Sequence, residues 1–177
     1  MPLARLQRKG GEIMGLDMYL SGDKYFVPDH KTLQAEYEAG KERPGPSEAR
    51  TLGKPVDADG EHISSSQHDL GYWRKFAPLH NYIVQNFANG VDECQQIELT
   101  EDDLEKIAVA LTDGALPSND DCGGFFFGSS DVWDEYRAEA AQHAAKIRAA
   151  AQWINSSPLH PSGSCAQWRS VHYQASW

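Results

Sequence analysis

The chain has 177 residues, a length that fits one domain and can bury a core without help from metals or disulfides. Its 26 acidic and 16 basic residues give a formal charge of −10, which disfavours direct binding to nucleic acid or to an anionic membrane. No apolar run is long enough to span a bilayer, and the three cysteines lack C-x-x-C spacing, which excludes a zinc ribbon. We therefore expect a cytosolic protein with no membrane contact and no cofactor.

The N-terminal third contains long polar stretches. Residues 1–13 are basic and contain glycines, so we expect either a disordered extension or a segment upstream of a natural start at Met14. The stretch 28–67 is polar and rich in helix breakers, and it predicts a surface insertion with a short helix at 33–39. We expect a single domain over 14–177.

Two segments have the alternation of strands. Apolar and polar residues alternate over 16–20, and the turn chemistry of Ser21-Gly22-Asp23 predicts a hairpin that returns over 24–27. The segment 167–174 also alternates, and we expect it to pair with 16–20.

The strongest helical pattern covers 71–90. Pro78 interrupts it, so either the helix kinks there or a new helix begins with Pro78 in its first turn. Asn89 and Gly90 provide a C-terminal stop. The expected buried positions, which recur every three or four residues, are Tyr72, Phe76, Leu79, Ile83 and Phe87.

Two more helices are expected downstream. Thr100 and Asp103 have the spacing of a capping box, and the apolar residues that follow give that helix a buried face. A long alanine-rich helix is expected over 130–154, after a glycine-bounded run of three phenylalanines at 125–127. Together these elements predict an α+β fold, mainly helical, with about three helices packed on a small antiparallel sheet.

Four blocks stand out in order along the chain: Met-Gly-Leu-Asp-Met-Tyr-Leu at 14–20, Tyr-Trp-Arg-Lys at 72–75 with His80, Gly-Val-Asp-Glu-Cys at 90–94, and Gly-Phe-Phe-Phe-Gly-Ser at 124–129 with the terminal Gln-Ala-Ser-Trp at 174–177. Together they resemble a family of small hypothetical proteins encoded by bacteriophages and prophages. Pro78 and the extension before Met14 depart from the family pattern. The resemblance implies a phage origin and a host-cytoplasmic setting, and it implies no reaction.

The segment Trp73-Arg74-Lys75 places an aromatic ring beside two cations, a combination that can stack a base or hold a phosphate. The alternative is that both cations lie on the solvated face of a core helix. The glycine-bounded phenylalanines are a second candidate, because glycines and a helix N-terminus allow close approach of an anion. Core packing of the phenylalanines is the alternative there.

His80 and Asn81 follow on the same segment. His80 with Asp92 or Cys94 has the residue types of a metal site or of a nucleophile and base pair. A histidine beside an apolar stripe is also a common hydrogen-bonded core residue. No paired ligands at short spacing indicate a metal, and no signature assigns catalytic residues.

These patterns favour a phage-encoded, non-enzymatic binding protein that acts on host physiology by capturing a small anionic ligand such as a nucleotide. Two other classes stay open: an acidic inhibitor that docks on a basic host protein or imitates nucleic acid, and a small hydrolase or metal enzyme. The oligomeric state is not predicted. The expected ligand-binding residues are Trp73, Arg74, Lys75, His80, Asn81, Asp92, Phe125, Phe127, Ser129 and Trp177.

Overall fold

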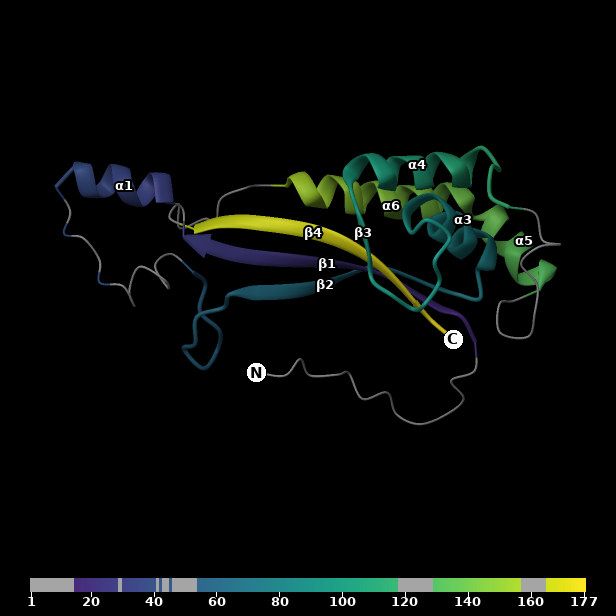
Figure 1. Ribbon diagram of the computed structural model, residues 1–177, viewed down its shortest axis with the longest axis horizontal. Coiled ribbons are helices and arrows are strands. Elements are labelled where there is room, and N and C mark those ends of the chain that lie inside the picture. Colours follow the sequence, from purple (N-terminus) through teal and green to yellow (C-terminus); the bar gives the residue numbers. More distant parts are fainter. Residues whose placement is uncertain are drawn as a thin grey trace.

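The computed structural model describes residues 15–28, 30–40, 42, 45, 54–117, 129–156 and 165–177. These form an α+β domain in which helices pack on one side of a four-stranded antiparallel sheet of order β2-β1-β4-β3 (Figure 1). The strands are β1 (Asp17–Pro28), β2 (Ser65–Arg74), β3 (Ile97–Leu99) and β4 (Cys165–Ser176). The helices are α1 (His30–Glu38), α3 (Ala77–Phe87), α4 (Glu101–Thr112), α5 (Ser130–Ala138) and α6 (Ala140–Asn155).

The predicted hairpin over 16–27 is wrong, because β1 is one continuous strand. Ser21-Gly22-Asp23 stays extended and pairs with β4 along its whole length. Gly22 is needed there for space: a Cβ would lie 2.8 Å from the ring of Trp153 on α6. Gly22 therefore allows α6 to pack closely on β1, and close approach of another element is a common reason for a glycine within a strand.

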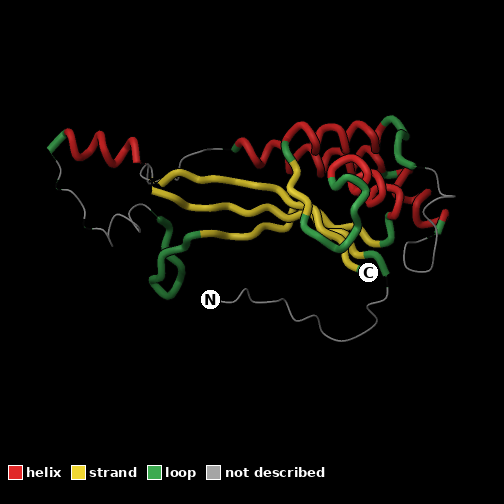
Figure 2. The backbone as a smooth tube through the Cα atoms, viewed as in Figure 1, coloured by secondary structure: helices red, strands yellow, loops and turns green. Residues whose placement is uncertain are grey.

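The predicted pairing of the last strand with 16–20 is confirmed. β1 and β4 run antiparallel from Asp17 opposite Ser176 to Pro28 opposite Cys165. They form the centre of the sheet, and Figure 2 shows β1, β2 and β4 as long, side-by-side strands. The short β3 pairs with β4 at the opposite edge from β2.

The helix predicted over 71–90 is shorter than expected, because 71–74 belong to β2. Lys75 turns the chain at a φ of 58°, and α3 then begins at Ala77 with Pro78 in its first turn. Pro78 lacks the N–H that this turn leaves without an intrahelical acceptor, so it starts the helix without penalty. Leu79 and Ile83 are buried as predicted, whereas Tyr72 is half exposed.

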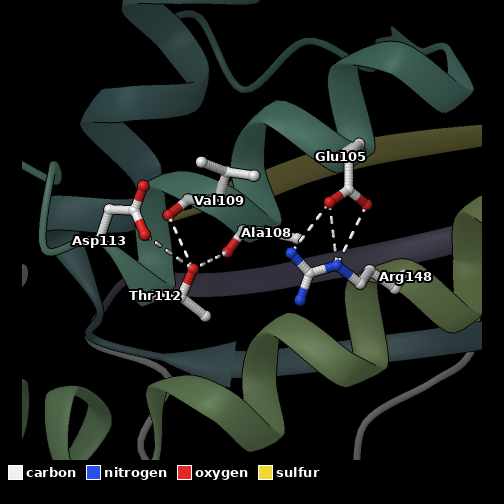
Figure 3. Close-up of polar contacts among 6 residues, drawn as sticks. All are labelled: Glu105, Ala108, Val109, Thr112, Asp113 and Arg148. Atoms are coloured by element: carbon white, nitrogen blue, oxygen red, sulfur yellow. Dashed lines mark hydrogen bonds and ion pairs between the residues drawn. The ribbon is translucent and has the colours of Figure 1, made fainter.

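The capping box that starts α4 is confirmed. The Thr100 hydroxyl accepts the Asp103 backbone N–H at 3.2 Å, and the Asp103 carboxylate accepts the Thr100 backbone N–H at 3.2 Å. The helix packs along α6, and Figure 3 shows Arg148 donating to both oxygens of Glu105 on the surface between them, at 2.9 to 3.1 Å. At the C-terminal end of α4 the Thr112 hydroxyl donates to backbone carbonyls of its own helix.

The single helix predicted over 130–154 is divided at Glu139 into α5 and α6. The two parts pack on different neighbours. In α5, the Trp133 indole donates to the Lys75 carbonyl at 2.9 Å and the Tyr136 hydroxyl bonds the backbone of Arg74. α6 instead packs on α4 and on the sheet. Because of this break, α5 packs against the corner after β2, and α6 packs against α4 and the sheet.

The two faces of the sheet differ. The inner face packs against the helices and supplies much of the core, with Leu20, Trp73, Val171 and Tyr173 buried. The outer face carries no described helix (Figure 1). By the strand registers it includes Asp17, Tyr19, Ser21, Asp23 and Tyr25 on β1, Asp69, Tyr72 and Arg74 on β2, Trp168, Ser170, His172 and Gln174 on β4, and Glu98 on β3.

Candidate functional site

Trp73 lies on the inner face and is only 2% exposed. Its Nε1 donates to Nδ1 of His143 at 3.0 Å, and the Lys146 ammonium lies 5.8 Å from the ring centre. Burial lowers the pKa of His143, the positive charge of Lys146 lowers it further, and Glu139 opposes them. A buried indole has no open face on which a ligand base can stack, so Trp73 acts as a core residue.

Arg74 and Lys75 do not join Trp73 in one pocket. Arg74 extends on the outer face, with Nε 3.9 Å from the Asp17 carboxylate. Lys75 forms the corner, where its backbone N–H donates to the Leu16 carbonyl at 2.7 Å. Phe125 and Phe127 lie outside the described residues. Ser129 precedes α5 without a side-chain capping bond. Ligand binding by this set stays a prediction.

His80 is 1% exposed and is hydrogen-bonded on both ring nitrogens. Nε2 lies 3.0 Å from the Asp92 carboxylate and Nδ1 lies 2.8 Å from the Tyr173 hydroxyl. A carboxylate only accepts, so Nε2 donates to Asp92, and in the neutral ring Nδ1 is then the acceptor of the Tyr173 hydroxyl. The Trp177 ring packs edge-on at 5.5 Å from the His80 ring, and Asn81 follows on α3, partly buried. His80 thus connects α3, the loop before β3, and β4.

This network has the residue types of a proton relay but lacks an accessible reacting group. Burial raises the pKa of the Tyr173 phenol well above its ordinary value, and the Asp92 charge raises it further, so Tyr173 stays a protonated donor. Asp92 is the partly exposed member, with 33% of its side chain accessible. Cys94 forms no hydrogen bond with His80, and within the described residues no group of histidine, cysteine or carboxylate side chains could hold a metal ion. The arrangement supports a structural role.

The outer face carries two pairs of aromatic side chains, one toward each end. Tyr25 on β1 stands opposite Trp168 on β4, and these side chains are 42% and 70% exposed. Tyr19 stands opposite Tyr72 on β2, with ring centres 5.4 Å apart. Tyr19 and Tyr25 are six positions apart on one strand, about 20 Å along the sheet. Large exposed aromatics in this number are typical of a surface that binds a partner.

Acidic groups lie between the aromatic pairs. A row across all four strands runs from Asp69 through Ser21 and His172 to Glu98, and both carboxylates at its ends are exposed. The next position on β1 that faces outward is Asp23, whose carboxylate lies 3.5 Å from Nε2 of His172. The Ser170 hydroxyl forms a hydrogen bond with the same nitrogen of His172, at 2.8 Å. Carboxylates therefore lie at both edges of the outer face, with Asp23 on a central strand between the aromatic pairs, and we take this face as the candidate site.

The sequence reasoning missed this surface although its signal was present. The predicted strand over 167–174 alternates, and Val171 and Tyr173 are the buried members. Trp168 and His172 occupy the alternate positions of this strand, so their side chains lie on the outer face. The alternation was used only to predict the pairing of this strand with 16–20, so the outward orientation of Trp168 was not predicted.

Searches against protein-family models, curated proteins and solved structures give no significant match. Phage origin stays a prediction. None of the described helices is both long and apolar enough to cross a bilayer.

Proposed function

We propose that this protein is a non-enzymatic binding module whose outer sheet face docks a positively charged segment of another protein. The observation that carries the proposal is the composition of that face: it combines the exposed aromatic side chains of Trp168, Tyr25 and Tyr72 with the carboxylates of Asp23, Asp69 and Glu98. This develops the acidic-inhibitor alternative. The pocket built around Trp73 loses support, because its aromatic member is buried.

The chemistry of the face fits lysine and arginine side chains. An arginine or lysine over an exposed tryptophan or tyrosine gains roughly 0.5 to 1 kcal/mol from the cation–π interaction. Carboxylates on the same face, such as that of Asp23 two positions from Tyr25, would add charge-assisted hydrogen bonds. An extended partner segment that spans both aromatic pairs would place cations over the rings and over the acidic row. The charge of −10 on the whole chain would speed the encounter with such a partner.

The test is calorimetric titration with a short, unstructured peptide of alternating arginine and alanine, at low and at high salt. The double variant Asp69→Asn with Glu98→Gln removes two charges from the acidic row. It should weaken binding about tenfold, the equivalent of 1.4 kcal/mol, and should show a smaller loss of affinity when salt is raised.

The matched control is Asp102→Asn with Glu135→Gln, which removes the same charge from exposed positions on α4 and α5. Its affinity should stay close to that of the wild type. Equal loss in both double variants would mean that only net charge matters, and the outer face would then have no specific role.

A further inference from the structure

A second charged cluster lies on the inner face, near the C-terminal end of α6. Lys24 on β1 stands directly opposite Arg169 on β4. The Lys24 ammonium lies 5.7 Å from the ring centre of Phe26, and the Arg169 guanidinium lies 4.9 Å from that of Trp153. Both cations are partly buried. Like charges directly opposite across a strand pair destabilise a sheet, so this pair is unfavourable as it stands.

Neither cation has an anionic partner in the part of the chain that the structure describes. Arg169 donates to the carbonyl of Trp153 at 2.8 Å, to the amide oxygen of Gln167 at 3.1 Å and to the hydroxyl of Ser156. These acceptors are all neutral. Nε of Arg169 is buried with no acceptor in the described residues, and Lys24 forms no ion pair there. The chain has 26 acidic residues, yet none of those described neutralises this pair.

The pKa directions agree with an uncompensated pair. Burial lowers the pKa of Lys24, and the charge of Arg169 lowers it further. Burial also lowers the pKa of Arg169. An oxyanion between the two side chains would reverse the repulsion and would accept hydrogen bonds from an ammonium and a guanidinium at once. Two positive charges match a phosphate better than a monovalent carboxylate.

We propose that Lys24 and Arg169 form a binding site for a phosphate group, carried by inorganic phosphate or by a small phosphomonoester. The site lies on the opposite side of the sheet from the outer face and does not depend on the docking proposal. The proposal keeps the predicted class of ligand, a small anion, but assigns it to residues other than the predicted ligand-binding residues. Trp153 and Phe26 form apolar walls beside the two cations.

The experiment is calorimetry with inorganic phosphate and with adenosine monophosphate, at constant ionic strength set with sodium chloride. The variant Lys24→Met keeps the length of the side chain and removes its charge, and Arg169 is left in place because it also holds the end of α6. Wild-type protein should bind at least one probe, and Lys24→Met should bind it about tenfold more weakly or worse. Tighter binding of the nucleotide would identify a phosphomonoester as the ligand, and equal binding would identify free phosphate.

Lys106→Met is the matched control, because Lys106 is exposed on α4 and is already paired with Asp103 at 3.2 Å. It should bind the probe like the wild type. Melting temperatures give a second readout. Without phosphate, Lys24→Met should have a higher melting temperature than the wild type, because the repulsion between Lys24 and Arg169 is lost. Phosphate should raise the melting temperature of the wild type but not that of the variant. Failure of both probes to bind the wild type, or equal affinity of wild type and Lys24→Met for a probe, would overturn the site.

Discussion

The two faces of the sheet use the same residue types for different purposes. On the inner face Trp73 is buried, its indole N–H is bonded to His143, and Gly22 makes room for Trp153. On the outer face Trp168 is mostly exposed and stands opposite the exposed Tyr25. Packing dominates the inner face, whereas the outer face leaves Trp168 and Tyr25 exposed and is buried only toward the end that carries Asp17.

This difference separates stability from recognition. Trp168 and Arg169 are neighbours in sequence, yet one points outward and the other contacts α6. Substitutions on the inner face should therefore change the free energy of unfolding, whereas substitutions on the outer face should change binding to a basic partner.

The largest expected effect is that of Trp73→Ala. Truncating a buried tryptophan removes its packing and leaves a cavity, which destabilises a protein by about 3 to 5 kcal/mol. It also leaves His143 without its donor. Urea unfolding of the purified variant measures the loss. A loss below about 1 kcal/mol would contradict the assignment of Trp73 to the core.

Gly22→Ala should have the next largest effect. The new methyl group would lie 2.8 Å from the Trp153 ring and 2.9 Å from Leu70. Overpacking of this kind destabilises by about 1 to 3 kcal/mol. Ser21→Ala, at the neighbouring outward position, is the control for urea unfolding and should leave the free energy nearly unchanged. Equal effects at the two positions would show that the faces are not distinguished by packing.

Acid should destabilise the inner face through His143. Its pKa is lowered in the folded protein from an ordinary value of about 6.5, so below that pH the unfolded chain takes up a proton that the folded protein excludes. The stability that neutral His143 contributes is therefore complete above the unfolded pKa and is lost as pH falls toward the lower folded value.

His143→Gln keeps an acceptor for the Trp73 indole and removes this titration. Urea unfolding at several pH values should show a smaller decline below about pH 6.5 for the variant than for the wild type. Lys146 and Glu139, the charged neighbours of His143, are unchanged in both proteins. Parallel declines would show that other groups cause the acid sensitivity.

The smallest effect on stability should be that of Trp168→Ala. A side chain that is 70% exposed loses little packing on truncation, so the free energy of unfolding should change by no more than about 0.5 kcal/mol. The same variant should lose affinity for the arginine-rich peptide, measured by calorimetry. Large destabilisation would place Trp168 in a packed environment and would remove it from the docking surface.

Local signals in the sequence predicted several elements well. The capping box at Thr100, the strand at 16–20 and its pairing with the last strand were predicted because each has a short-range pattern. The start of α3 was misplaced because Tyr72 and Phe76 fit a helical period as well as a strand and corner. Tertiary contacts decide between them: the pairing of Tyr72 and Trp73 with β1 and the hydrogen bond from Trp73 to His143, 70 positions away.

The site was harder to predict, for a physical reason. His80 and Asp92 were identified as polar candidates, but Tyr173 completes their network from the other end of the chain. The acidic row from Asp69 to Glu98 exists only through strand order, which brings β2 and β3 to opposite edges of one sheet. Composition gives the total charge but not its placement.

The most direct test of the docking proposal is to map the binding surface by NMR. Backbone amide shifts of labelled protein are followed during titration with the arginine-alanine peptide. Our account predicts that the affected amides cluster on the outer face, around Tyr25, Asp69, Glu98 and Trp168. Shifts that cluster instead on α4 and α5, or that spread evenly over all acidic positions, would contradict it.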